Sequence, residues 1–196
     1  MLQTDLTLSV VSDFRIVKMI LSDHNLREMI RDSHLVIEPL SEGTVQQNGV
    51  DFRMDEEIGI STTIDSEIID STSSAEIKKF YQILKSDEEH FIFSPRNHYL
   101  LTTKERIKMP NDLIGFCGLR STFARLGFLS PLTIIDAGFE GTLTIGVFYG
   151  GSSAIRIPVG CRFLHVVFAH LVEKADVPYQ GKYKNQKGVS IPKALV

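Results

Sequence analysis

The chain has 196 residues, of which 43% are hydrophobic and 23% charged, as is typical of a globular protein with a sizeable core in one domain or with two small domains. A net charge of -3 argues against non-specific binding to nucleic acid or to an anionic membrane. No apolar run is long enough to span a bilayer, and two cysteines without a CxxC pair argue against a disulfide framework or a zinc cluster. We therefore expect a cytoplasmic protein with no membrane or nucleic-acid partner.

The first part of the chain predicts one helix after a weakly patterned start. Residues 1–18 alternate weakly and predict an edge strand or an N-terminal extension. A helix is expected to begin at Ser22 or Asp23, both good capping residues, and to end at about Ser33. Its apolar residues recur at helical spacing: Leu26, Met29 and Ile30.

Short strands separated by turn signals fill most of the remaining chain. Strands are expected within residues 35–40, 50–53, 91–102, 142–148 and 155–168, with another just before residue 119. Asn48-Gly49 is a strong turn signal, and a short helix is predicted over residues 75–84. Many short strands with two or three short helices predict an all-β sandwich or barrel, and the absence of GxGxxG and GxxxxGK[ST] disfavours Rossmann and P-loop folds.

Residues 119–127, LRSTFARLG, predict a short helix with a defined start and stop. Ser121 is the expected N-cap, and Gly127 is the expected residue after the last turn, because glycine enters the left-handed region freely. Phe123 and Leu126 lie three residues apart and are expected to share a buried face.

This helix also predicts an anion site. Free N–H groups, the Ser121 hydroxyl and the guanidinium groups of Arg120 and Arg125 together suit a phosphate. The alternative is a surface helix whose arginines pair with carboxylates, and composition alone favours that alternative.

Five segments, in this order, resemble the dUTPase and dCTP deaminase superfamily: NGVDFR, LRSTFARLG, IIDAGFEGTLTI, VGCRFLHVVF and YQGKYKNQKG. The resemblance extends from about Met19 to Gly188. MILSDHNL and GKYKNQKG are most similar to the deaminase branch, including its archaeal dUTPase-type members. The resemblance implies a distorted β jelly roll with a few short helices, formed by residues 19–196 as a single domain. It also implies a flexible closing segment at about 176–196 and a homotrimer with active sites between subunits.

The resemblance further implies a deoxyuridine or deoxycytidine triphosphate as ligand, with Mg²⁺ bound through its phosphates. Asp136 matches the aspartate that in dUTPases orients the attacking water, and Phe139 matches the aromatic residue beneath the deoxyribose. Asp51 is expected near the site, where it supports an arginine or a metal-bound water. The other implied substrate-binding residues are Arg120, Ser121, Thr122, Arg125, Ile135, Thr144, His165, Tyr179, Lys182 and Gln186.

Several of these residues have a purely structural alternative. Aspartate is common in glycine-rich turns for backbone reasons, which applies to Asp136. Phe139 could belong to the core, His165 lies in an apolar strand, and runs of lysine such as that near Lys182 are usually solvated.

One departure from the family pattern guides the functional prediction. In dCTP deaminases a glutamate on the strand after the GFxG-like turn activates water, and here that position is Gly146. Glycine cannot move a proton, and the arginine that precedes the Ile-Asp pair in deaminases is also missing. The leading prediction is therefore a Mg²⁺-dependent dUTP diphosphatase that yields dUMP and pyrophosphate. The alternatives are a dCTP deaminase, alone or bifunctional, and a non-catalytic deoxynucleotide-binding relative.

Overall fold

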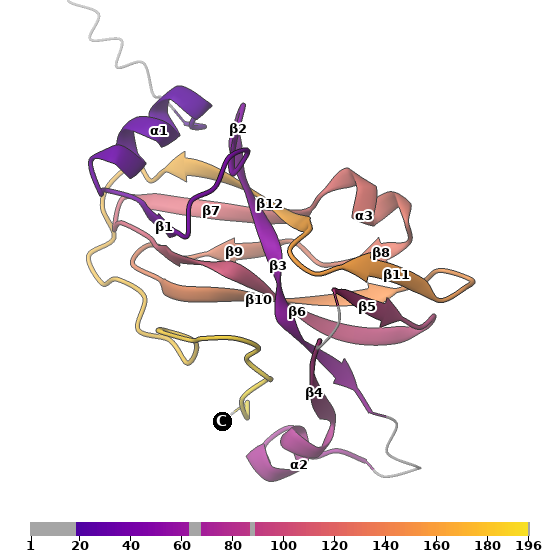
Figure 1. The fold of residues 1–196 in the computed structure, drawn as a ribbon. Coiled ribbons are helices and arrows are strands. Elements are labelled where there is room, and N and C mark those ends of the chain that lie inside the picture. Colours follow the sequence, from indigo (N-terminus) through magenta and orange to yellow (C-terminus); the bar gives the residue numbers. More distant parts are fainter. Residues whose placement is uncertain (1–18, 63–67, 87–88, 196) are drawn as a thin grey trace, which may run out of the picture.

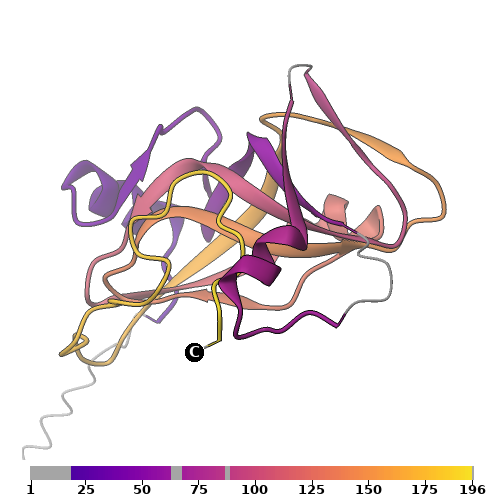
Figure 2. The ribbon, with the colours of Figure 1, turned by 90° about the horizontal axis from the view of Figure 1, so that it is seen from below.

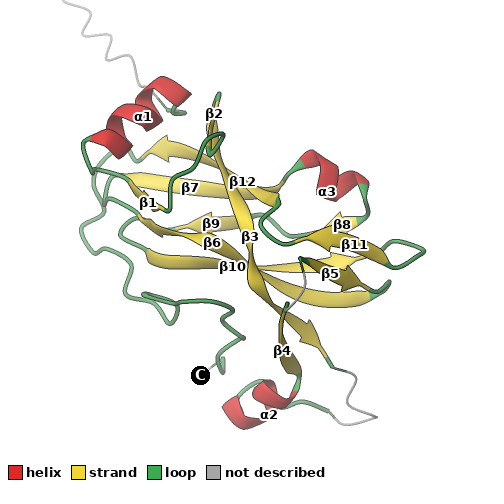
Figure 3. Ribbon diagram, in the orientation of Figure 1, coloured by secondary structure: helices red, strands yellow, loops and turns green. Residues whose placement is uncertain are grey.

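Strands dominate the computed structural model, which describes residues 19–62, 68–86 and 89–195 (Figures 1 and 3). Residues 1–18, with their predicted edge strand or extension, lie outside the described residues. The elements in chain order are α1 Asp23–Arg31, β1 Val36–Glu38, β2 Val45–Gln46, β3 Gly49–Ser61, α2 Ser74–Lys79, β4 Tyr81–Lys85, β5 His90–Phe93, β6 Asn97–Lys108, β7 Leu113–Leu119, α3 Ser121–Arg125, β8 Phe128–Leu129, β9 Thr133–Ile135, β10 Glu140–Tyr149, β11 Ile155–Pro158 and β12 Arg162–His170. No helix among these is long and apolar enough to cross a membrane.

One curled antiparallel sheet holds most of the strands. Its order is β8-β10-β6-β3-β12-β7-β9, with β1 paired to β6 and both β2 and β4 paired to β3. Strands β5 and β11 form a separate pair. The long strands β3 and β6 connect the two halves of the sheet, which curls into a half-barrel (Figures 1 and 2). The predicted all-β fold with a few short helices is confirmed.

An aromatic cluster fills the core beside α3. Phe93 and Phe128 are fully buried with ring centroids 5.2 Å apart, and the Phe123 ring lies 5.2 Å from that of Phe128. Burial of one such ring contributes about 1.5–3 kcal/mol to folding. Phe123 therefore fastens the short helix α3, and the arginines around it, to the rigid part of the molecule.

The predicted first helix and most predicted strands are confirmed. Helix α1 has Ser22 as its N-cap and buries Leu26 completely. The turn at Asn48-Gly49 joins β2 to β3, and the alternation in β10 buries Leu143, Ile145 and Val147 as expected.

Three local predictions are wrong. The helix predicted over residues 75–84 ends at its C-cap Phe80, and the following residues form β4, which pairs with β3 from Glu57 to Ser61. The tertiary pairing overrides an apolar spacing that also suited a helix. In α3 the N-cap is Arg120 rather than Ser121, and Leu126 remains 39% exposed instead of sharing the buried face of Phe123.

The last segment of the chain lies across the outer face of its own sheet (Figures 1 and 2). The carbonyl of Gly188 accepts from the Thr102 hydroxyl at 3.0 Å, and the Thr142 N–H donates to the Gln186 carbonyl at 3.0 Å. Gly141 has φ +144°, and a Cβ there would lie 2.9 Å from the Gln186 carbonyl oxygen, so only glycine permits this approach. The mobility of the closing segment stays a prediction.

Candidate functional site

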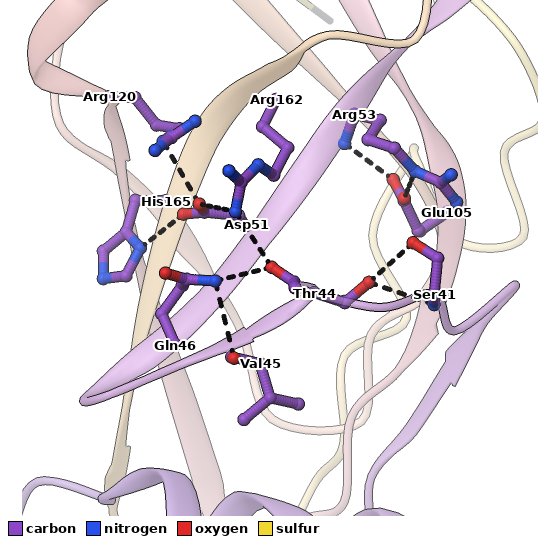
Figure 4. Close-up of polar contacts among 11 residues, drawn as sticks. Ser41, Thr44, Val45, Gln46, Asp51, Arg53, Glu105, Arg120, Arg162 and His165 are labelled. Carbon is purple, nitrogen blue, oxygen red and sulfur yellow. Dashed lines mark hydrogen bonds and ion pairs between the residues drawn. The ribbon is translucent and has the colours of Figure 1, made fainter.

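A buried carboxylate with three nitrogen-bearing partners lies where β3, β7 and β12 meet (Figure 4). Asp51 of β3 is 2% exposed, and its Oδ1 lies 2.8 Å from Nδ1 of His165. Its Oδ2 lies 3.1 Å from Nε of Arg120 and 3.3 Å from Nη1 of Arg162. Oδ2 meets both guanidinium groups as an ion pair rather than through a well-aligned hydrogen bond.

Strand irregularity brings these partners onto one face. Arg162 and His165 are three residues apart, so in a regular strand they would face opposite sides. The register between β12 and β3 shifts between Arg162 and Leu164, and this extra residue turns both side chains toward Asp51. Gly49 of β3 also permits the close approach of β12, because a Cβ on residue 49 would lie 2.4 Å from the Val166 carbonyl oxygen.

The cluster retains positive charge at the surface. Two arginines against one carboxylate leave an excess of positive charge. The Arg120 and Arg162 side chains are 34% and 39% exposed, so their outer N–H groups remain accessible to an anion. Arg120 therefore pairs with a carboxylate, as the alternative reading of the helix expects, and the anion site stays a prediction.

Sequence reasoning missed Arg162 and the buried pair behind the cluster. Glu105 is fully buried, and its carboxylate accepts from Nε of Arg53 at 2.6 Å and from the Arg53 backbone N–H at 2.8 Å. This pair ties β3 to β6 next to Asp51. The only local signal for Arg162 was a basic residue beginning a strand after Gly160, which is too common to single out.

Apart from this cluster, a mostly apolar pocket of about 290 Å³ lies between the β9–β10 turn and the C-terminal segment. Phe139 lines this pocket and is buried, and its ring centroid lies 5.6 Å from that of Tyr179. Asp136 lines the pocket from an exposed position in the turn. In the described part of the chain no side chain bonds to the Asp136 carboxylate, which leaves it open to water. The pocket is also lined by Leu100, Ile135, Thr144, Tyr183, Gln186 and Ser190.

The predicted site residues fall into two groups. Ile135, Asp136, Phe139, Thr144, Tyr179 and Gln186 line the apolar pocket. Asp51, Arg120 and His165 form the charged cluster. Ser121, Thr122 and Arg125 lie exposed on α3, and the Lys182 ammonium donates to the Ala194 carbonyl. The charged cluster and the apolar pocket share no residue, so a single chain does not bring all predicted residues into one cavity.

The position expected to hold a catalytic glutamate in a deaminase lies on the outer face of β10. A Cβ on Gly146 would lie 3.2 Å from Nε2 of His98, so the imidazole borders the space left by the missing side chain. Nδ1 of His98 lies 3.3 Å from the Tyr81 hydroxyl. Burial lowers the pKa of His98 and raises the pKa of Tyr81.

Comparison with solved structures defines the class of fold. The structure is similar to 2'-deoxycytidine 5'-triphosphate deaminase from Agrobacterium tumefaciens, with a TM-score of 0.62 at 18% identity. The similarity covers 78% of this chain and 48% of that one, so the present chain spans about half the length of that protein.

The chain belongs to the family described as dCTP deaminase-like, which matches residues 20–171. It is 45% identical over 175 residues to the dCTP deaminase of Acidianus ambivalens, across 89% of this chain and 98% of the relative. It is 46% identical over 175 residues to a probable deoxyuridine 5'-triphosphate nucleotidohydrolase of Sulfolobus islandicus rod-shaped virus 1, across 89% of this chain and 99% of the relative. The predicted superfamily is confirmed, and the chain is an enzyme of deoxynucleotide metabolism.

Proposed function

We propose that this enzyme hydrolyses dUTP to dUMP and pyrophosphate. The observation that carries the proposal is Gly146, which supplies no proton-transferring group where the deaminase reaction requires one. The carboxylate of Asp136, open to water at the rim of the apolar pocket, is instead retained. The similarity to a probable deoxyuridine triphosphate nucleotidohydrolase supports the same choice.

The sugar and base occupy the apolar pocket in this proposal, and the phosphates extend toward arginines. Phe139 supports the deoxyribose, and backbone groups of residues 135–144 contact the base. Asp136 holds a water in line with the α-phosphorus; as the water oxygen bonds to phosphorus, the bond to the β-phosphate oxygen breaks and pyrophosphate leaves. Arg120, Arg125 and the helix start at Ser121 stabilise the charge that develops on the phosphates.

Magnesium fits this scheme as an ion carried by the triphosphate. Both oxygens of Asp51 face guanidinium or imidazole nitrogens, an arrangement that favours ion pairing over metal coordination. Among the described residues, no group of three or more His, Cys, Asp and Glu side chains is placed to hold a metal ion. Mg²⁺ would supply charge neutralisation on phosphate oxygens, and the metal-supporting role of Asp51 stays a prediction.

The separation of the two groups of residues supports an active site shared between copies of the chain. We expect a homotrimer in which the apolar pocket of one subunit faces the arginines of another. Mixing Asp136→Asn protein with Arg125→Ala protein tests this arrangement, because each variant keeps the half that the other lacks. In randomly mixed trimers about one quarter of the interfaces are intact, so activity returns to about that fraction of wild type. No recovery after subunit exchange would place both residues in one chain.

A product assay decides the reaction. Purified protein is incubated with Mg²⁺ and either dUTP or dCTP, and both pyrophosphate and ammonia are measured. We expect pyrophosphate from dUTP, a loss of about 100-fold or more in Asp136→Asn, and little change in the exposed control Asp32→Asn. Absence of pyrophosphate from the wild type, or full activity in Asp136→Asn, would overturn the proposal.

The second candidate function is dCTP deamination. It is favoured by the names of several relatives, which are called dCTP deaminase. This reaction needs a proton-transferring group other than residue 146. Ammonia release from dCTP identifies it, alone or together with pyrophosphate release. Tight binding of either nucleotide without any product would instead indicate a non-catalytic relative.

A further inference from the structure

A second hollow lies next to the apolar pocket on the same face of the sheet. Thr144 lines the apolar pocket and Gly146 lines the second hollow. Both residues belong to β10, where alternate residues lie on the same face of the sheet, about 7 Å from each other. On β6, Leu100 lines the first and His98 the second. The pairing of β10 with β6 sets Gly146 beside Leu100 and Phe148 beside His98, so the two hollows are neighbours on one face of the sheet. We call this stretch of the face, from Thr144 to Phe148, the groove.

Gly146 leaves the imidazole of His98 open to this groove. The position that a Cβ would take on Gly146 lies 3.2 Å from Nε2 of His98, and no side chain stands between them there. The other lining residues of the second hollow are Leu129, Ser130, Pro131 and Phe148. His98 Nε2 is thus the nitrogen that a ligand in the groove would meet.

The Tyr81 hydroxyl sets which form of the imidazole faces the groove. It lies 3.3 Å from Nδ1 of His98, and the two rings meet edge to face with centroids 6.2 Å apart. A phenol is a better hydrogen-bond donor than acceptor, and a neutral imidazole nitrogen is a strong acceptor, so the hydroxyl donates to Nδ1. The proton of the neutral ring then resides on Nε2, which points a donor toward Gly146. Burial lowers the pKa of His98, which keeps this neutral form dominant near pH 7.

We propose that His98 is a base-specificity residue that donates its Nε2–H to the 4-carbonyl oxygen of uracil. The inference rests on the proposed function, which places the sugar at Phe139 and the base toward Thr144. At position 4 uracil presents an acceptor, whereas cytosine presents an amino donor. An Nε2–H donor therefore favours uracil and leaves the cytosine amino group facing another donor.

The test measures binding rather than turnover, with the non-hydrolysable α,β-imido analogues of dUTP and dCTP. The ratio of the two dissociation constants is compared in wild type, His98→Leu, His98→Gln and Tyr81→Phe. His98→Leu removes the donor, and we expect the preference for the dUTP analogue to fall about 10- to 100-fold. His98→Gln keeps an N–H donor and retains most of the preference, while Tyr81→Phe frees Nδ1 and lowers it by a smaller factor. The control His24→Gln changes an exposed histidine on α1 and leaves the ratio unchanged.

Gly146→Glu provides an independent test that leaves His98 in place. A carboxylate beside Nε2 would accept its proton and present an acceptor to the groove, so the preference should move toward the dCTP analogue. If the ratio of dissociation constants is unchanged in both His98→Leu and Gly146→Glu, the inference is overturned. If His98→Leu does not fold, an unchanged ratio in both Tyr81→Phe and Gly146→Glu overturns it instead. If wild-type protein binds the dUTP analogue preferentially but releases no pyrophosphate from dUTP, the proposed hydrolysis is refuted. The role of His98 in base preference would stand.

Discussion

Replacement of Asp51 by asparagine should destabilise the protein, because it removes the carboxylate that three side chains share. Asp51 is 2% exposed, and its oxygens lie 2.8–3.3 Å from His165, Arg120 and Arg162. The amide keeps the shape of the side chain but loses the charge, and it places an NH₂ group against donors. Two guanidinium groups would then repel each other without a carboxylate between them.

The expected loss is intermediate between that of a buried and an exposed ion pair. Breaking a fully buried pair costs about 3–5 kcal/mol, because an uncompensated charge stays in the interior. The three partners here are 28–39% exposed and can turn to water, which lowers the cost to about 2–3 kcal/mol. For a domain of this size that loss corresponds to a fall in Tm of about 4–12 °C.

Thermal unfolding of the variant and a matched control measures this effect. Asp32→Asn makes the same chemical change in an exposed pair with Arg31, in which both side chains are more than 60% exposed, so it should alter stability by less than about 1 kcal/mol. If the Tm of Asp51→Asn equals that of Asp32→Asn, the carboxylate does not organise the cluster. Weaker binding of the dUTP analogue should accompany the lower Tm, since Arg120 loses the group that orients it.

Three further predictions concern the closing segment, His98 and the cysteines. Gln186→Ala removes a 2.6 Å hydrogen bond to the Thr142 carbonyl and should speed tryptic cleavage of the C-terminal segment, whereas Gln180→Ala should not. Burial lowers the pKa of His98 from 6.5, so the unfolded chain takes up a proton at this residue before the folded chain does as the pH falls. The Tm should therefore drop more steeply between pH 7 and pH 5 in wild type than in His98→Gln. Equal slopes of Tm against pH in the two proteins would contradict this. Burial raises the pKa of Cys117 to about 12 and that of Cys161 to about 11. At pH 8 both thiols should therefore react with iodoacetamide far more slowly in the folded protein than in protein unfolded with guanidinium. Fast labelling of the folded protein would disprove their burial.

Local signals in the sequence were enough for most of the secondary structure. The cap at Ser22, the turn at Asn48-Gly49 and the alternation through Leu143, Ile145 and Val147 depend on a few neighbouring residues. Such signals survive folding when the tertiary structure agrees with them. The segment after Phe80 is the exception, because its pairing with β3 outweighs its local pattern.

The sequence by itself determined the family, the curled β fold and the absence of a carboxylate at Gly146. Only the tertiary structure decided that Asp51 would be buried among Arg120, Arg162 and His165, up to 114 residues away in the chain. A shifted register between β12 and β3 creates that cluster, and strand register depends on contacts along the whole sheet rather than on neighbouring residues. The same dependence placed His98 beside Gly146, because a groove on a sheet is made by residues that pair across strands, wherever they lie in the sequence.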